Sequence, residues 1–430
     1  MDIFSLILPK YIIDKNKKIR LISLFSGYDS QKLAFDYLGI DVEHYCAIEF
    51  DKYAIQSLNE IHNTYFETKD ITKVNADELG IVDTENITYL LTYSFPCTDL
   101  SIAGKRAGMD KESGTRSGLL WEVERLLRET KEKPQILIME NVPQVLSAKG
   151  WREWNVFLEN LGYSNYAQIL NAKNFGIPQN RERCFMVSIL GDYSYEFPRP
   201  FELKDRLKDF LETNVDEKYY LSEKTIERIS KWKAQQDPLK DIDKEKSISP
   251  CLTARGAGEE HSGMILINEN LYKNENRKNI IDIGVVIKEQ YQGTYNYDSS
   301  DNFISGKSRY KYNNNIMPTL LTRDKVGVVV KVENYSPDEH NVNTIVDNIP
   351  SLRIRKLTPL ECFKLMGVKP SDYLKISCSN AQKYKQAGNS IVTTCLMAIY
   401  SQLFDDVDYK YYIEKLLKEL RTNGNNISSL

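Results

Sequence analysis

The chain contains 430 residues, of which 41% are hydrophobic and 27% are charged, and these fractions are typical of a folded protein rather than a disordered one. Its formal net charge of −3 excludes a basic coat over the whole chain but not a local basic patch. The 7 cysteines form no C-x-x-C pair, so the sequence indicates neither a zinc cluster nor a disulfide framework, and we expect no metal. No apolar run reaches about 18 residues, so we expect no membrane partner and a cytoplasmic location.

Residues 19–190 alternate between short apolar runs and amphipathic segments. The apolar runs predict strands over residues 19–25, 44–49, 87–93, 135–139 and 184–187. The amphipathic segments predict helices over residues 31–38, 52–62, 119–128 and 151–161, and an apolar run predicts one over 391–403. Strands that alternate with helices of this length predict a parallel, doubly wound α/β sheet, in which ligands bind at the carboxyl ends of the strands.

The middle of the chain has a different composition. Residues 198–349 are rich in Asn, Tyr, Lys, Ser and Gly and have weak periodicity, which predicts short strands and loops, and the segment 353–385 that follows is basic. We therefore expect a first domain over 1–197, a mixed domain over 198–349, and a C-terminal segment over 350–430 that completes the first domain.

The first predicted strand runs into a tight turn at Phe25–Gly27. A strand, a glycine turn and a helix start together form a nucleotide-binding corner, because free N–H groups point outward there. Glu49 ends the next apolar run, where an acidic residue would bind ribose hydroxyls, and Asp70 lies where a carboxylate would meet an adenine edge. One glycine is not a G-x-G-x-x-G fingerprint, so an ordinary βα turn remains an equal alternative.

The strongest candidate nucleophile follows the strand predicted over 87–93. Cys97 stands at the carboxyl end of that strand, directly after Pro96, which stiffens the approach. The loop over 101–118 is too polar and too rich in glycine for a core and is typical of a mobile lid. A cysteine is more often a small buried hydrophobe, and that alternative stands on these residues alone.

Charged side chains at two other strand ends are further candidates. Glu140 follows the strand predicted over 135–139 and could face Cys97 across a crevice, although a solvent-facing carboxylate would give the same pattern. Arg181 and Arg183 are two residues apart, which places two cations on one face of a strand. Exposure to solvent is the usual fate of such a pair.

Six motifs, taken in their order, resemble the DNA (cytosine-5)-methyltransferase family. They are F-S-G at 25–27, P-C at 96–97 with its Ser- and Gly-rich loop, E-N-V at 140–142, Q-N-R-E-R at 179–183, R-K-L-T-P-L-E-C-F-K-L-M-G-V at 355–368 and Q-A-G-N-S-I-V at 386–392. Together they span the chain from about residue 19 to about residue 400 and leave only the middle segment unmatched. The resemblance implies a Rossmann-like α/β sheet of the S-adenosylmethionine-dependent methyltransferase type, with a second, smaller, mixed target-recognition domain.

The resemblance also implies a reaction, with S-adenosyl-L-methionine as the methyl donor and double-stranded DNA as the partner. Cys97 would add to C6 of a cytosine flipped out of the duplex, and C5 would then accept the methyl group. Glu140 would protonate or hydrogen-bond N3 of the base. Arg183 would hold Glu140, and Arg181 would lie at the O2 region of the base.

The positions that the resemblance assigns to the methyl donor are Phe25, Ser26, Gly27, Glu49, Phe50, Asp70, Ile71, Leu120, Asn389 and Ser390. Phe25 and Phe50 would pack near the adenine, and Gly27 would line the methionine end. Glu49 would bind the ribose and Asp70 the adenine amino group, while Leu120 and Asn389-Ser390 would close the pocket. The chain departs from the family pattern at Ser23, where an acidic residue is usual, and at Asp29-Ser30, where glycines are usual.

We therefore expect a sequence-specific enzyme of the bacterial or phage restriction-modification type, working as a monomer, with a cognate restriction endonuclease as the protein partner to be considered. Residues 198–349 would carry target recognition, and the basic segment 353–385 would face phosphates. The alternatives are the tRNA-methylating branch of the family, an inactive DNA-binding regulator on the same scaffold, and an NAD-dependent dehydrogenase. The long recognition segment and the residues after P-C disfavour the first, and the absent G-x-G-x-x-G spacing disfavours the last.

Overall fold

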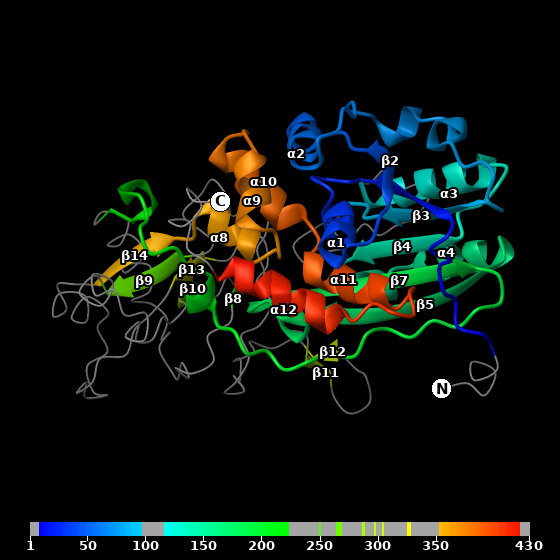
Figure 1. Ribbon diagram of the computed structural model, residues 1–430. Coiled ribbons are helices and arrows are strands. Elements are labelled where there is room, and N and C mark those ends of the chain that lie inside the picture. Colours follow the sequence, from blue (N-terminus) through cyan, green and yellow to red (C-terminus); the bar gives the residue numbers. More distant parts are fainter. Residues whose placement is uncertain are drawn as a thin grey trace.

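The computed structural model describes residues 8–96, 116–222 and 352–421, together with the backbone of short strands within 249–327 (Figure 1). Cys97 and the loop over 101–115 lie outside the described residues. The strands of the first region are β1 (Lys18–Leu24), β2 (Glu43–Ile48), β3 (Ile87–Tyr93), β4 (Ile136–Asn141), β5 (Tyr163–Asn171), β6 (Gln179–Asn180) and β7 (Glu182–Leu190). The α-helices are α1 (Ser30–Leu38), α2 (Lys52–His62), α3 (Leu120–Glu129), α4 (Trp151–Asn160), α8 (Pro359–Lys364), α9 (Pro370–Lys375), α10 (Asn380–Asn389), α11 (Thr393–Ser401) and α12 (Tyr409–Leu420).

These elements confirm the strands and helices predicted from the apolar patterns, and they form an α/β fold around one central sheet. The sheet has six strands in the order β2-β1-β3-β4-β7-β5. Strands β2, β1, β3 and β4 run parallel to one another, as expected. Strand β7 is antiparallel to both of its neighbours, so the prediction of a wholly parallel sheet is wrong at this edge.

The reversal at β7 has a simple cause. A parallel return needs a crossover, usually a helix, whereas the connection from β5 to β7 holds only a short 3-10 turn and β6, so the chain returns antiparallel. The sequence analysis did not predict β5, whose stretch YSNYAQILN lacks an apolar run. As an edge strand with several partly or fully exposed side chains, β5 needs no such run.

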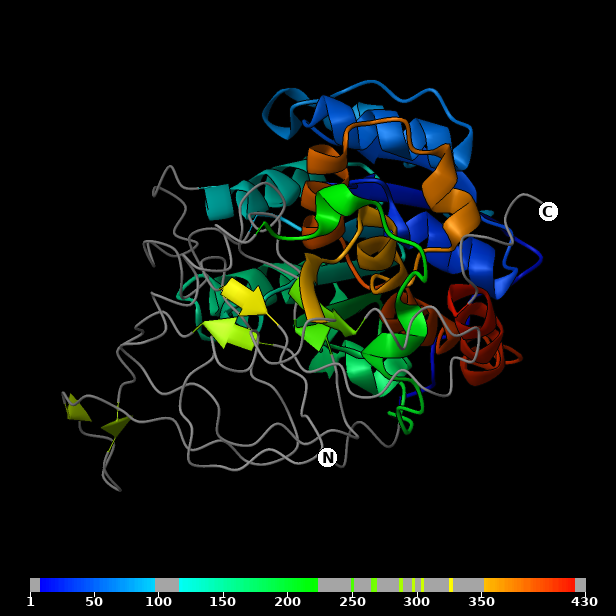
Figure 2. The same cartoon turned by 90° about the vertical axis from the view of Figure 1, so that its left-hand side faces the viewer.

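Helices cover both faces of the sheet because successive strand residues point to opposite sides. Ile136 and Ile138 of β4 join the core under α1, α11 and α12, whereas Leu137 and Met139 join the core under α3 and α4. The C-terminal helices therefore lie beside α1, although the sequence separates them by more than 350 residues, and both views show this (Figures 1 and 2). This packing brings the segment before α11 next to the turn between β1 and α1.

The pieces of the middle region that the structure describes are short strands, as expected. They are β8 (Ser249–Pro250), β9 (Met264–Asn268), β10 (Val286–Lys288), β11 (Asn296–Tyr297), β12 (Phe303–Ile304) and β13 (Lys325–Gly327). Strand β8 pairs with β6, and β9 pairs with β14 (Leu352–Lys356), so the middle region is joined to the flanking segments by strand pairing on both sides. Within the described parts of the chain, no helix is long and apolar enough to cross a membrane.

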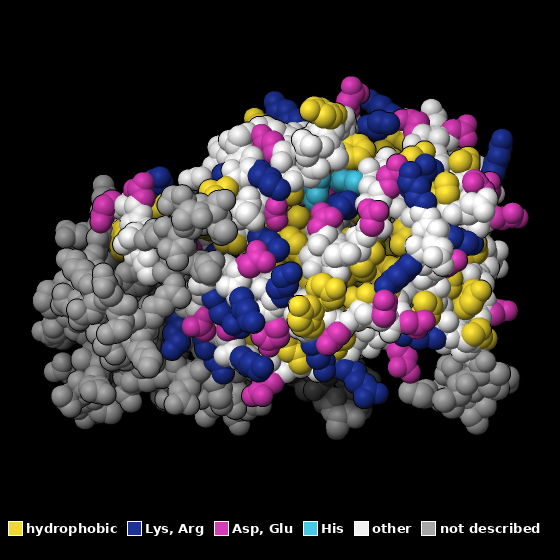
Figure 3. All heavy atoms as spheres, viewed as in Figure 1, with side chains coloured by type: hydrophobic (Ala, Val, Ile, Leu, Met, Phe, Trp, Pro, Cys, Tyr) yellow, Lys and Arg dark blue, Asp and Glu magenta, His cyan; other side chains and the backbone are white. Residues whose placement is uncertain are grey.

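The basic segment 353–385 is not a continuous phosphate-facing surface. Arg355 and Lys364 are each only 1% exposed, and Arg355 forms a two-pronged ion pair with the buried Glu361. The expectation that this whole segment faces DNA is therefore wrong for these two cations, because the fold uses them inside. On the face drawn in Figure 3, basic and acidic side chains of the described residues are interspersed.

Candidate active site

A buried carboxyl group stands at the carboxyl end of β4. Glu140 is 8% exposed, and its Oε1 lies 3.1 Å from Nε of Arg183 on the neighbouring strand β7. The nearby Ser94 acts to lower the pKa of this carboxyl group. Burial raises the pKa of Glu140, although Arg183 and Arg181 act in the opposite direction. Glu140 therefore takes up a proton more readily than an exposed glutamate does.

The backbone that leads to Cys97 is tied to the same edge of the sheet. Nδ2 of Asn141 donates a hydrogen bond of 3.0 Å to the carbonyl oxygen of Phe95, and Oδ1 of Asn141 accepts one of 2.8 Å from the N–H of Val142. Pro96 is the last described residue before Cys97. The described residues that precede Cys97 thus lie beside Glu140, and Cys97 itself lies outside the described residues.

Arg181 connects this edge to the C-terminal segment. It is 3% exposed, and its Nη2 donates to the carbonyl oxygens of Gly388 at 3.1 Å and Ser390 at 2.7 Å. The hydroxyl of Ser390 in turn accepts a hydrogen bond of 2.8 Å from Tyr28. A line of hydrogen bonds therefore runs from Arg181 to the turn after β1. The sequence analysis missed Tyr28, since nothing but its place in the turn distinguishes it.

The turn between β1 and α1 has an unusual backbone. Phe25, Gly27 and Asp29 all have positive φ, at 57°, 59° and 60°. The N–H of Gly27 donates to Oε2 of Glu49 at 3.0 Å, and Oε1 of Glu49 accepts the N–H of Asp51 at 2.8 Å. Burial raises the pKa of Glu49. Gly27 and Glu49, which the sequence analysis assigned to different ends of the methyl donor, are thus in direct contact.

The sequence of the chain matches a known family. The model of the family described as C-5 cytosine-specific DNA methylase matches residues 19–405. The chain belongs to this family. It is a DNA cytosine-5 methyltransferase, and its methyl donor is S-adenosyl-L-methionine, as for the family. An NAD-dependent dehydrogenase is thereby excluded.

Similar proteins agree with this assignment over nearly the whole chain. An orphan methyltransferase of Bacillus phage SPbeta is 27% identical, over 90% of this chain and 97% of its own length. A type II methyltransferase of Lactococcus lactis subsp. cremoris is 28% identical, over 90% of this chain and 99% of its own. Among solved structures, the S. pombe Dnmt2 methyltransferase has the same fold, with a TM-score of 0.58, 20% identity and coverage of 90% of this chain and 98% of that one.

The turn of the methyltransferase fits a polar ligand such as the methyl donor. A Cβ atom added to Gly27 would meet nothing within 4 Å, so the backbone there borders open space. The hydroxyl of Ser26 is buried and has no hydrogen-bond partner among the described residues. An unpartnered buried hydroxyl is costly unless a ligand or water satisfies it, so it indicates a binding position.

Further predicted residues gather around Glu49. Phe50 is 77% exposed although it is a large aromatic residue, which suits a side chain that packs on a ligand ring. The N–H of Lys69 donates to the carbonyl oxygen of Glu49 at 2.9 Å and so places Asp70 nearby. Asp70 accepts two hydrogen bonds from Thr72, and these lower the pKa of Asp70.

The remaining predicted positions differ in exposure. Ile71 and Leu120 are buried in the core, at 5% and 0% exposure. Asn389 is exposed at the end of α10, and Ser390 follows it with the contacts to Arg181 and Tyr28. Within the described part of the chain, no group of three or more His, Cys, Asp and Glu side chains could hold a metal ion.

Proposed function

We propose that this methyltransferase modifies a cytosine within a specific sequence of double-stranded DNA, through a covalent adduct between Cys97 and C6 of the base. The observation that carries the proposal is the buried Glu140–Arg183 pair, which stands beside the backbone leading to Cys97. A nucleophile and a proton donor at one sheet edge are what addition to a pyrimidine ring requires.

The base must leave the duplex for this chemistry. The thiolate has to approach C6 perpendicular to the ring, which stacking prevents, so the cytosine is flipped out at a cost of a few kcal/mol. A neutral cytosine is a poor electrophile, and Glu140 relieves this by protonating or hydrogen-bonding N3 as the sulfur adds. Its raised pKa supports that role, and Arg183 orients the carboxyl group. Arg181 would act at the O2 region of the base.

When bound, S-adenosyl-L-methionine supplies the electrophilic methyl group that C5 accepts. We assign Glu49 to its ribose hydroxyls and Phe50 to the face of its adenine. We assign Asp70 to the adenine amino group, and the turn at Phe25–Gly27 to the methionine end. Water would take the C5 proton, and the electron pair of the C5–H bond would form the C5=C6 double bond as the C6–S bond breaks, which would release Cys97 as a thiolate.

Target recognition is assigned to residues 198–349, with 1–197 and 350–430 together forming the catalytic domain. Strand pairing joins the middle region to β6 and β14, which supports its placement next to the catalytic domain. The enzyme would act as a monomer in the cytoplasm, where its substrate DNA lies. A cognate restriction endonuclease would recognise the same sequence that this enzyme methylates. Light scattering of the purified protein tests the oligomeric state, and a mass of 49.8 kDa would support a monomer.

Bisulfite sequencing of plasmid DNA from cells that express the protein tests both the reaction and its sequence specificity. We expect cytosines protected within one short sequence and unprotected elsewhere. Cys97→Ser should abolish this protection while DNA binding survives. With the wild-type enzyme and methyl donor, a duplex carrying 5-fluorocytosine at the target should give a denaturant-resistant adduct, and its absence would overturn the covalent mechanism.

Methyl transfer to matched duplex DNA and tRNA separates the two branches of the family. Transfer to DNA alone supports the proposal, and transfer to tRNA alone overturns it. A protein that binds DNA but transfers no methyl group to either would be the inactive regulator. The Glu140–Arg183 pair argues against that outcome, because a regulator gains nothing from a buried carboxyl group with a raised pKa.

A further inference from the structure

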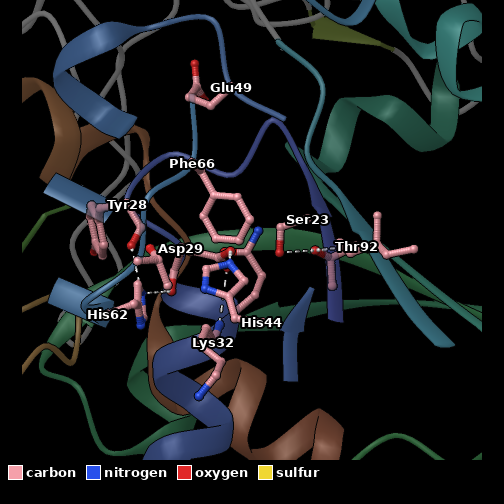
Figure 4. Close-up of polar contacts among 12 residues, drawn as sticks. Ser23, Tyr28, Asp29, Lys32, His44, Glu49, His62, Phe66 and Thr92 are labelled. Atoms are coloured by element: carbon pink, nitrogen blue, oxygen red, sulfur yellow. Dashed lines mark hydrogen bonds and ion pairs between the residues drawn. The ribbon is translucent and has the colours of Figure 1, made fainter. Parts of the chain in front are cut away.

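Beneath the turn at Phe25–Gly27 lies a buried cluster of one carboxylate and two imidazoles, which we call the clasp: Asp29, His44 and His62 (Figure 4). Nε2 of His44, on β2, lies 2.7 Å from Oδ2 of Asp29. The side chains of Asp29, His44 and His62 are 0%, 5% and 3% exposed. In Figure 4 Asp29 lies between the two rings, while Glu49 lies apart from the clasp at the far end of β2.

The hydrogen bonds fix where the protons of the clasp lie. Nε2 of His62 is 3.1 Å from the carbonyl oxygen of Tyr28 and 3.2 Å from that of Asp29. Carbonyl oxygens only accept, so this nitrogen carries the proton and donates. An ionised carboxylate also only accepts, so Nε2 of His44 donates to Asp29. Burial acts to raise the pKa of Asp29, but the interactions with His44, His62 and Ser23 outweigh it and keep the pKa below its ordinary value.

Asp29 would be a costly residue without these partners. Its φ of 60° is free for glycine and costs most other residues about 1–2 kcal/mol, although aspartate and asparagine tolerate it better than most. Its carboxylate is buried, and an unpaired buried charge costs several kcal/mol more. The N–H of Lys32 adds a further hydrogen bond to Asp29, at 3.2 Å. Ser23 and Asp29 are both positions where the chain departs from the family pattern, and Ser23 is among the residues that lower the pKa of Asp29.

The clasp holds the turn from the same unit that carries Glu49. His44 stands near the start of β2 and binds the Asp29 side chain, while His62 ends α2 and binds the backbone of Tyr28 and Asp29. Between them in the sequence, Glu49 accepts the N–H of Gly27. The turn is therefore fixed at three points on β2 and α2, and its position relative to Glu49 depends on all three.

We propose that Asp29, His44 and His62 are positioning residues that hold the turn in the shape needed to bind S-adenosyl-L-methionine. The proposal rests on the proposed assignment of this turn and Glu49 to the methyl donor. None of the three needs to touch the donor. They act by keeping the N–H of Gly27 and the hydroxyl of Ser26 in place, because the turn has a backbone conformation that would not be stable without these contacts.

The test is isothermal titration calorimetry of the full-length protein with S-adenosylhomocysteine, which binds without reacting. Asp29→Gly keeps the positive φ free of strain but removes the carboxylate, and we expect about tenfold weaker binding, the scale of one charge-assisted hydrogen bond. His44→Leu should weaken binding similarly, whereas His44→Gln keeps a donor and should restore most of it. The double variant Asp29→Gly with His44→Leu should be no worse than either single change.

A matched control removes another helix-capping aspartate. Asp408 accepts the N–H of Lys410 at 3.0 Å at the start of α12, as Asp29 accepts that of Lys32 at the start of α1. Asp408→Gly should lower thermal stability without changing the dissociation constant. If Asp29→Gly fails to fold, Asp29→Asn replaces it, because asparagine tolerates positive φ and loses only the charge.

Two outcomes separate the clasp from the assignment on which it rests. Glu49→Gln should weaken S-adenosylhomocysteine binding if the donor site is where we place it. If Glu49→Gln weakens binding and Asp29→Gly does not, the clasp proposal is overturned and the site assignment stands. If neither variant changes binding, the site assignment fails, and the clasp proposal fails with it.

Discussion

Two buried glutamates of this methyltransferase, each paired with an arginine, are held in very different ways. Glu361 accepts both Nη atoms of Arg355, at 2.8 and 2.7 Å, and the N–H groups of Thr358 at 2.7 Å and Glu212 at 2.8 Å. Glu140 is paired with Arg183, whose Nε lies 3.1 Å from Oε1 of the carboxyl group. The carboxylate of Glu361 is therefore saturated with hydrogen-bond donors, whereas the oxygens of Glu140 keep lone pairs that can still accept a hydrogen bond.

This difference indicates that the Glu361–Arg355 pair stabilises the fold, whereas the Glu140–Arg183 pair serves the reaction. A carboxylate that accepts four hydrogen bonds cannot easily change partners, because each lost bond would leave a buried donor unsatisfied. Glu361 thereby joins Glu212, near the start of the middle region, to β14 and α8, which follow that region. Glu140 has a raised pKa and stands at a strand end where a base could be received. The same pair of residue types thus serves rigidity in one place and reactivity in the other.

The largest effect should come from Glu361→Gln. The variant keeps the shape of the side chain but leaves Arg355 charged, buried and without its counter-charge, which should lower the free energy of unfolding by about 3–5 kcal/mol. Urea unfolding followed by circular dichroism measures this. A loss below about 1 kcal/mol would mean that the pair behaves as a surface salt bridge, contrary to its burial.

Glu140→Gln should show the opposite balance. We expect methyl transfer to fall at least about 100-fold, because the variant cannot supply a proton to N3, while the free energy of unfolding changes by less than about 1 kcal/mol. Single-turnover methylation and urea unfolding of the same preparation measure the two quantities. Equal losses of stability in Glu140→Gln and Glu361→Gln would remove the distinction between the two pairs.

How far the sequence reaches can be judged from these residues. The apolar runs predicted β1 to β4 and their helices, because buried parallel strands need continuous apolar side chains. The motifs predicted that Arg183 holds Glu140, and they assigned Gly27 and Glu49 to one binding site. The basic composition of 353–385 led to the wrong prediction that the whole segment faces phosphates, because composition cannot distinguish a buried Arg355 from an exposed lysine. Burial depends on which distant segment supplies a partner such as Glu361.

The clasp could not be predicted from the sequence for the same reason. Asp29, His44 and His62 lie on three elements, and nothing in their spacing predicts that they meet. Asp29 was visible only as a departure from a glycine-rich pattern. Its positive φ shows that the departure changes the side chain while the backbone keeps a conformation typical of glycine. A local sequence therefore indicated the turn, but only the tertiary structure shows what holds it.

A third, smaller effect concerns a buried group that stays neutral. Burial lowers the pKa of His62 to about 4, and the neighbouring His44 acts in the same direction. Asp29 and Asp36 act to raise this pKa, but they do not outweigh burial. The unfolded chain binds a proton near pH 6.5, so stability is fully present above that pH and falls as the pH drops toward 4. Between pH 6.5 and 5.5 we expect His62 to cost about 1 kcal/mol. His62→Gln should lack this loss, and parallel urea curves of the two proteins measure the difference; equal slopes with pH would contradict it.

The smallest effect on stability, and the sharpest test of the basic segment, should come from Lys385→Ala. The side chain of Lys385 is 47% exposed and its Nζ lies 2.6 Å from Asp51, so its removal should cost less than about 1 kcal/mol of stability. If Lys385 exchanges this partner for a phosphate, the slope of log affinity against log salt should fall by about 0.9 for DNA. Lys410→Ala, an exposed lysine on α12 outside the segment, serves as the control and should leave the slope unchanged. Because Arg355 and Lys364 are buried, only the exposed cations of the segment can contribute, and an unchanged slope in Lys385→Ala would remove Lys385 from the DNA interface as well.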